Sequence, residues 1–135
     1  MKGKIIAGTA ALLLGLAVVL GAWNAHGMES LVEKGLMQAK YIKTFHTGVQ
    51  YQFIIATVLL IIGVAYQEIQ KLLLLSTVLL LSGMLIFSGS LYLLAFHEML
   101  GEGLKILGMV APIGGLCMTA GFLLLGIHFF KNKQA

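Results

Sequence analysis

The sequence predicts an all-α membrane protein with four transmembrane helices in an up-down-up-down bundle. Hydrophobic residues make up 59% of the 135 residues and charged residues only 10%, whereas a soluble domain carries about 25% charged residues. Four stretches of 19 to 25 residues contain no Asp, Glu, Lys or Arg, and about 20 apolar residues are needed to cross the hydrocarbon core. Lipid admits only helices and closed barrels, and these stretches lack the alternation of barrel strands.

We expect one domain over residues 1–135, with membrane helices at about 5–25, 47–67, 72–96 and 106–130. The first segment follows Lys2 and Lys4 and ends in small residues, so it also fits a secretory signal peptide, although its length favours a retained helix. Short connections at 67–71 and 97–105 indicate antiparallel neighbours. The second of these contains two glycines and is expected to be a flexible turn.

Between the first two membrane segments, residues 28–45 have a different pattern. Apolar side chains recur there at three- and four-residue spacing, with lysines and glutamates filling much of the remaining surface. This pattern predicts an amphipathic helix lying flat in the membrane interface. A soluble cap packed over the bundle would use the same apolar face.

Pro112 interrupts the fourth membrane segment. A proline at this place either kinks a continuous helix or begins a helix at its first position. In the second case the residues before Pro112 would form a separate short element, and such broken helices often mark binding sites. The simple kink is the preferred interpretation.

The charge of +4 comes from nine lysines without any arginine. Nucleic-acid binding favours a clustered basic surface with arginine, whereas these lysines stand at segment ends, where they contact lipid headgroups. Five of them (Lys2, Lys4, Lys71, Lys131, Lys133) lie at the end that holds both termini, against four at the other end. The positive-inside rule therefore favours two cytoplasmic termini.

Small residues are the first candidates for functional contacts, because lipid gives helices no hydrophobic reason to associate and close backbone approach supplies the contact. Several recur at four-residue spacing. The candidate packing set is Ala7, Ala11, Gly15, Ala17, Gly21, Ala25, Gly83, Gly89, Gly114 and Gly115. Faces not used within the bundle would serve for association with a second copy or with other membrane proteins.

Polar side chains suggest two further groups. The first is a hydrogen-bonded cluster near one interface, made of Tyr51, Gln52, Ser88, Ser90 and Tyr92. The second lies at the membrane face where three histidines fall, and its candidate ligand set is His26, His46, His97, Glu98 and Glu102. Imidazole and carboxylate groups at one depth can bind a transition metal, and two histidines can ligate haem iron. The spacing matches no known ligand pattern, and the sequence requires no cofactor.

Motifs of soluble enzymes are absent from the sequence. It has no paired carboxylate within the membrane, no nucleophile beside a base and no phosphate-binding glycine loop. Pumps and ion channels usually rely on charged groups within their membrane segments, and these segments have none. We therefore expect a non-enzymatic protein, and a transporter or channel is a weaker alternative.

Four short strings stand out along the chain: Gly21–Gly27 (GAWNAHG), Thr47–Gln52 (TGVQYQ), Phe87–Tyr92 (FSGSLY) and Ala111–Gly115 (APIGG). Taken in this order, they resemble the YgdD-like family of small bacterial inner-membrane proteins. The resemblance implies a four-helix protein of the inner membrane without an established biochemical activity. Ile55 stands where the family usually has a histidine, and Ala111 where it has a threonine, which weakens the case for a metal site shared across the family.

These observations lead to two hypotheses. The first is a structural or interaction protein of the bacterial inner membrane that supports the envelope through its glycine faces. The second is a membrane protein that binds a metal, haem or a lipophilic ligand at its histidine-rich face.

Overall fold

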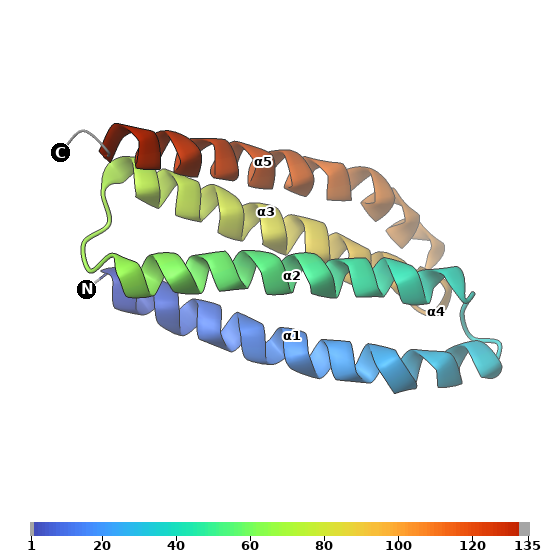
Figure 1. Ribbon diagram of the computed structural model, residues 1–135. Helices are drawn as coiled ribbons and strands as arrows, with labels where there is room; N and C mark the ends of the chain where they lie inside the picture. Colours follow the sequence, from blue (N-terminus) through green and yellow to red (C-terminus); the bar gives the residue numbers. More distant parts are fainter. Residues whose placement is uncertain (1, 133–135) are drawn as a thin grey trace.

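The computed structural model describes residues 2–132, and all the regular secondary structure in that range is helical (Figure 1). The elements are α1 (Lys2–Glu33), α2 (Lys40–Ala65), α3 (Lys71–Ala95), the short α4 (His97–Leu100), a single 3-10 helix η1 (Glu102–Ile106), and α5 (Leu107–Asn132). Four helical segments are long and apolar enough to cross a membrane, the last one including η1. No strand occurs between residues 2 and 132. The chain is thus an all-helical protein with four candidate membrane spans.

The long helices lie side by side in the order α1, α2, α3, α5 (Figure 1). Each is packed against the next in the chain, while the backbones of α1 and α5 do not approach each other within the described residues. Neighbours run in opposite directions: Gly3, at the start of α1, lies against Tyr66, just after the end of α2. The arrangement is therefore open, with α1 and α5 on its two flanks.

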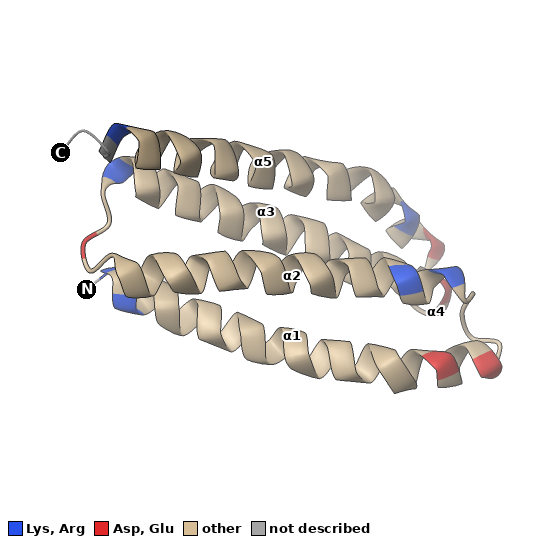
Figure 2. Cartoon of the chain, in the orientation of Figure 1, with Lys and Arg blue, Asp and Glu red and all other residues tan. Residues whose placement is uncertain are grey.

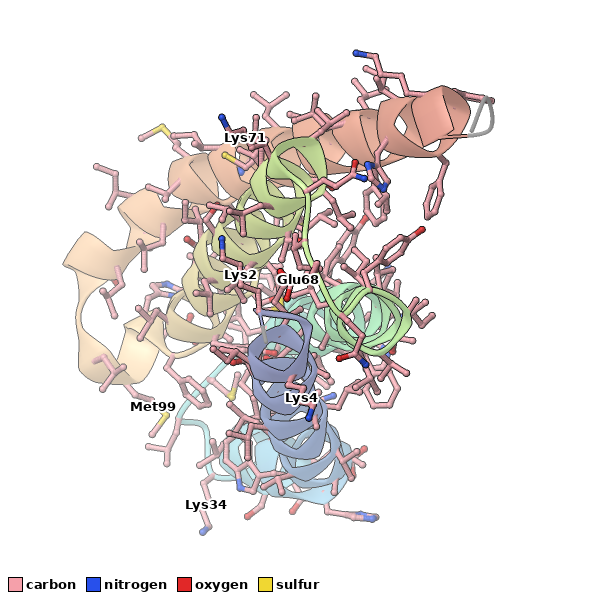
Figure 3. All side chains as sticks on the ribbon, turned by 90° about the vertical axis from the view of Figure 1, so that its left-hand side faces the viewer. Lys2, Lys4, Lys34, Glu68, Lys71 and Met99 are labelled. Carbon is pink, nitrogen blue, oxygen red and sulfur yellow. The ribbon has the colours of Figure 1, made fainter. Side chains whose placement is uncertain are left out.

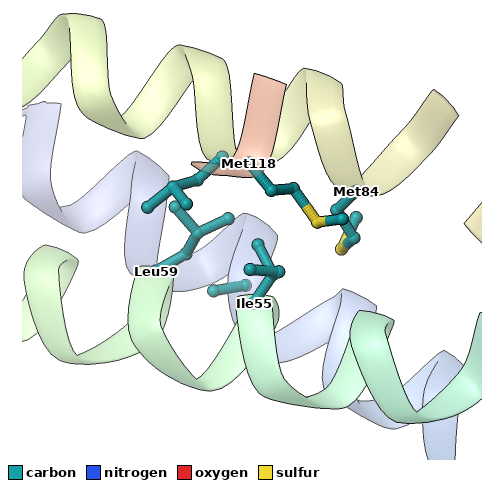
Figure 4. Packing of buried hydrophobic residues seen from close by; sticks show 6 residues of the cluster. Ile55, Leu59, Met84 and Met118 are labelled. Atoms are coloured by element: carbon teal, nitrogen blue, oxygen red, sulfur yellow. The ribbon is translucent and has the colours of Figure 1, made fainter. Parts of the chain in front are cut away.

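A central apolar cluster joins all four long helices (Figure 4). Its buried members are Ala10, Ile55, Leu59, Leu80, Met84 and Met118. Leu80 is fully buried and Met84 nearly so. Because lipid tails are as apolar as these side chains, the cluster stabilises the bundle through van der Waals packing and not through transfer out of water.

Glycines set the closest approaches between helices. At the α3–α5 crossing, a Cβ added to Gly83 would lie 2.7 Å from the carbonyl oxygen of Gly114, and one added to Gly114 would lie 2.6 Å from that of Gly83. At the α1–α2 crossing, Gly63 meets the backbone of Ala7. Both crossings depend on backbone-to-backbone contact that any side chain would prevent.

The expected amphipathic helix at 28–45 is wrong, because α1 continues to Glu33 and α2 begins at Lys40. Gly35 adopts a φ of +70°, the left-handed conformation that commonly ends a helix. The Gly35 amide donates to the Val32 carbonyl and the Leu36 amide to the Leu31 carbonyl, which is the Schellman pattern. The apolar periodicity arose because residues on both sides of this turn, among them Met28 and Phe45, face one cluster.

The connection between α3 and α5 is more ordered than a flexible turn. It contains α4 and η1, separated by Gly101, whose φ is +144°. Pro112 lies inside α5, which continues through it and curves at this end (Figure 1). The helix-start alternative for Pro112 is therefore wrong. At this position proline removes the hydrogen bond to the Gly108 carbonyl and its ring crowds that carbonyl, which accounts for the curve of the helix.

Candidate functional site

Gln52 lies at the centre of the polar contacts between helices. Its Nε2 donates to the Leu13 carbonyl of α1 (2.9 Å), and its Oε1 accepts from the Tyr92 hydroxyl of α3 (2.7 Å). The side chain is 3% exposed. Both polar ends of one buried amide are thus satisfied by two different helices, as burial in an apolar environment requires.

Ser88 adds a second bond between α3 and α2. Its Oγ donates to the Gly48 carbonyl at 2.7 Å, and Tyr92 lies against Gly48, where a Cβ would be 2.7 Å from the tyrosine ring. The structure therefore brings together Gln52, Ser88 and Tyr92 from the predicted cluster. The partners Leu13 and Gly48 contribute backbone carbonyls, which residue types do not reveal.

Tyr51 and Ser90 do not join this cluster. The Tyr51 side chain is 41% exposed and its ring rests on Phe87, with 4.6 Å between ring centroids. Ser90 is buried but is not hydrogen-bonded to Gln52 or Tyr92. A further bond joins α3 to α5, where the Ser76 Oγ donates to the Gly121 carbonyl at 2.8 Å. Ser76, Gly83, Ser90 and His97 recur every seven residues, a spacing that predicts one small, polar side of this helix facing protein.

At the histidine-rich end, His97 is buried with both ring nitrogens engaged. Its Nδ1 lies 2.8 Å from the Leu94 carbonyl oxygen, and because a carbonyl only accepts, Nδ1 carries the proton. Its Nε2 lies 3.5 Å from the Tyr41 hydroxyl, and the two rings meet edge to face. Such a ring holds α4 against the start of α2 and has no nitrogen directed at open space.

The remaining members of the predicted ligand set lie apart from His97 or have other partners. His26 and His46 are exposed. Glu98 accepts two bonds from Gln38, one from the backbone amide at 2.9 Å and one from the side-chain amide at 2.6 Å. Glu102 forms an ion pair with Lys105. Within residues 2–132 no three His, Cys, Asp or Glu side chains are grouped closely enough to hold a metal ion.

Glu98 instead fastens the turn between α1 and α2 to α4, because Gln38 belongs to that turn. An aromatic cluster lies at the same end, where the Trp23 ring contacts those of Phe45 and Phe96, each with 5.7 Å between centroids. Aromatic rings at this level are typical of the membrane–water interface. This end of the molecule is thus a closed polar and aromatic layer.

The candidate packing residues fall into two groups. Gly83, Gly114, Ala7, Ala17 and Gly21 lie at contacts between helices. The others make no close contact with a neighbouring helix. Gly15 and Gly89 have open space where a side chain would be, and a Cβ on Gly115 would make only a 4.0 Å contact with the Phe87 ring. Ala11 and Ala25 are exposed. Close contacts at Gly3, Gly48, Gly63 and Gly121 were not foreseen. Spacing identifies which residues share a face but leaves open which face meets a neighbour.

Among the residues that the structure describes, Asn24 has the one buried side-chain polar atom without a hydrogen-bond partner. The residue is 6% exposed, and its Oδ1 has no hydrogen-bond partner. Leucine has nearly the same shape without polar atoms, so Asn24→Leu is expected to stabilise the protein by roughly 0.5–1 kcal/mol. The measurement is the melting temperature in mild detergent, with Asn24→Ala as the variant that removes packing as well. A lower melting temperature for Asn24→Leu would show that Oδ1 has a partner in the folded protein.

A comparison with known protein families shows to which family the chain belongs. Residues 20–115 match the family model described as "Protein of unknown function (DUF423)". The chain belongs to the DUF423 family. Its match covers the end of α1, the whole of α2 and α3, and the beginning of α5. Of the hydrogen bonds between helices described above, those of Ser88 with Gly48 and of Tyr92 with Gln52 lie wholly within the match.

Relatives of this DUF423 chain extend over nearly its whole length. The UPF0382 membrane protein SH2409 of Staphylococcus haemolyticus is 39% identical over 131 residues, which is 97% of this chain and 98% of the relative. The UPF0382 membrane protein YwdK of Bacillus subtilis is 34% identical over 133 residues, 97% and 98% of the two chains.

The UPF0382 inner membrane protein YgdD of Escherichia coli is 33% identical over 118 residues, 87% of this chain and 82% of the relative. No solved structure matches the chain. The resemblance drawn from the four sequence strings is thereby confirmed. The chain is a membrane protein of a family described as having unknown function.

Proposed function

We propose that this chain is a multi-pass protein of the bacterial inner membrane that acts by associating with other membrane helices, and not by catalysis, in support of the cell envelope. Its four helices would cross the bilayer in alternating directions with both termini in the cytoplasm. The inner-membrane name of the Escherichia coli relative supports the location. Five lysines at the end with the termini support the orientation, although Lys133 lies outside the described residues.

The distribution of charge agrees with this orientation. Figure 2 shows lysines at the end where the chain begins, with one acidic position in the α2–α3 connection, and mixed charges at the other end. The mixed end contains Glu29, Glu33, Glu98 and Glu102 along with its lysines. Acidic residues contribute little to orientation, so the proposal is supported by the lysine excess of five against four.

The observation that carries the proposal is the exposed surface of α1. Only 11% of its most apolar window is buried inside the molecule, against 28–44% for the other three spans. Within the bundle its backbone lies close to that of α2 alone. The outward surface includes Gly8, Ala11 and Gly15, and a Cβ at either glycine would meet nothing within 4 Å. Small residues on a lipid-facing helix permit close approach of a second helix.

The experiment compares Gly15→Leu with Gly126→Leu. Gly126 also has open space around it but lies on α5, so both variants are expected to fold. Cross-linking in native membranes should give assemblies of the wild-type chain and of the Gly126 variant. The Gly15 variant should give only the single 14.5 kDa chain. Light scattering in mild detergent measures the same masses. Equal behaviour of the two variants, or a wild type without cross-linked partners, would contradict the proposal.

A further inference from the structure

An apolar groove lies between α1 and α3 near the end where both helices begin. It forms because both helices pack against α2 while their own backbones do not approach each other closely. Its volume is about 180 Å³, and its walls include Ile5, Ile6, Leu59, Leu74, Val78 and Leu81. The Thr77 hydroxyl at its wall is already used, since it donates to the Leu73 carbonyl at 2.8 Å. Apart from Thr9, which also lines the groove, its walls therefore offer apolar contact.

The same gap between α1 and α3 opens again farther along the helices. There a second hollow of about 210 Å³ is lined by residues that include Leu13, Leu16, Met84 and Leu85. Counted along α1, its residues follow those of the first groove by about two turns. These two hollows, called the track below, follow one another along the helix axes, the direction in which an acyl chain lies in a bilayer.

Two lysines stand at the outer end of this track. Lys2 precedes Ile5 and Ile6 by one helical turn, and Lys71 precedes Leu74 by the same interval. Figure 3 shows both side chains extending to the same side of the molecule, while Lys4 extends away from α3. All three lysines are exposed. The two ammonium groups thus lie at headgroup level beside the mouth of an apolar groove.

Helix termini add to this positive potential. Both α1 and α3 begin at these lysines, and the N-cap of α3, Gln70, makes no side-chain capping bond. The free backbone amides of a first turn and the helix dipole both favour an anion. Figure 3 shows Glu68 near the start of α1, and its side chain is engaged in an interaction. Two lysines against this one carboxylate leave the end of the groove with an excess of positive charge.

We propose that this groove binds an anionic phospholipid, with its phosphate between Lys2 and Lys71 and an acyl chain along the track between α1 and α3. Basic pockets between membrane helices on the cytoplasmic side are suited to anionic headgroups. The adjoining apolar walls distinguish a phospholipid from a free phosphate, because only a lipid fills the groove and the charged end together. The assignment requires the helices to span the bilayer but does not depend on self-association through α1.

The test titrates dioleoyl phosphatidylglycerol into the full chain in dodecyl maltoside and follows the melting temperature. The double variant Lys2→Gln/Lys71→Gln is compared with Lys4→Gln/Lys131→Gln, which removes the same charge from the same end. Each lysine near a membrane surface contributes about 1 kcal/mol of attraction, reduced by salt, so the first variant should need roughly tenfold more lipid. The control variant should resemble the wild type. Dioleoyl phosphatidylcholine and glycerol phosphate should give much smaller shifts in the wild type.

Several outcomes would overturn this assignment. Equal losses in the two double variants would indicate general attraction to the charged end, and a glycerol phosphate shift as large as that of the lipid would indicate a simple anion site. Absence of a shift with phosphatidylglycerol in the wild type would remove the site altogether. Val78→Trp, at a wall position that is 51% exposed, fills the groove and leaves both lysines in place. If Val78→Trp binds the lipid as tightly as the wild type, the acyl chain does not lie in the groove.

Discussion

Gly114→Ala is expected to lower the free energy of unfolding by about 2–3 kcal/mol, the range found when a well-packed core is overfilled. The added methyl group would lie 2.5 Å from the Phe87 amide nitrogen and 2.6 Å from the Gly83 carbonyl oxygen. Both atoms belong to the α3 backbone, so relief requires the two helices to separate. In an open helical position the same substitution would stabilise by roughly 0.5–1 kcal/mol, so the expected sign is opposite to that of helix propensity.

Thermal melting of the full chain in mild detergent measures this effect. Gly126→Ala is the matched control, because Gly126 lies on the same helix with nothing within 4 Å. Gly83→Ala should act like Gly114→Ala, and the double variant should cost less than the two single variants together, since one separation of α3 from α5 relieves both contacts. Unchanged melting of Gly114→Ala would mean that these helices do not cross at the glycine pair.

The membrane spans could be predicted from the sequence because bilayer thickness fixes helix length and excludes charges over that length. The third span was expected at 72–96 and α3 is found at Lys71–Ala95. The ends of the first helix were harder to predict. α1 extends to Glu33, beyond the apolar stretch, because its last turns pack Met28 against the start of α2.

Periodicity failed where a turn separates two helices that face the same cluster. The pattern over 28–45 indicates which residues are buried, but it does not indicate that the chain reverses direction at Gly35. Glycine itself was the available signal, since a glycine after a helical pattern commonly marks its end. The high amphipathic regularity on both sides outweighed that signal.

Residue type predicted which side chains need partners, but the sequence did not predict the direction in which each side chain points from its helix. Gln52 and Tyr92 were recognised because polar side chains inside an apolar span need partners, and the two are bonded to each other. His26 and His46 were placed at the correct end, but the rotation of α1 and α2 about their axes leaves them exposed while His97 is buried. Helix rotation is decided by packing against neighbours, which one sequence does not display.

Gln52→Leu is expected to lower the free energy of unfolding by about 1–2 kcal/mol. The leucine removes two hydrogen bonds between helices, which average about 0.6 kcal/mol each in membranes, and it leaves the Tyr92 hydroxyl and the Leu13 carbonyl without these partners. A buried polar group left without a hydrogen-bond partner lowers the free energy of unfolding by more than the lost bond itself. Melting in mild detergent measures the change, and an unaltered melting temperature would show that the cluster contributes nothing.

A double-mutant cycle with Tyr92→Phe separates the bond from the packing. If the Tyr92 hydroxyl donates to Gln52, the summed losses of the two single variants should exceed the loss of the double variant by roughly 0.5–1.5 kcal/mol, which is the coupling energy. Tyr51→Phe is the control, since its ring rests on Phe87 and its neighbour Gln52 bonds elsewhere.

The Gln52→Leu substitution is also expected to affect α1. The Leu13 bond joins α1 to α2, the one long helix whose backbone lies close to it. Gln52→Leu should therefore loosen α1 more than the α3–α5 pair. Hydrogen exchange should rise in the middle of α1 and stay unchanged around Gly114, because the glycine crossing does not depend on Gln52. A uniform rise across all four helices would instead mean that the bundle opens as one cooperative unit.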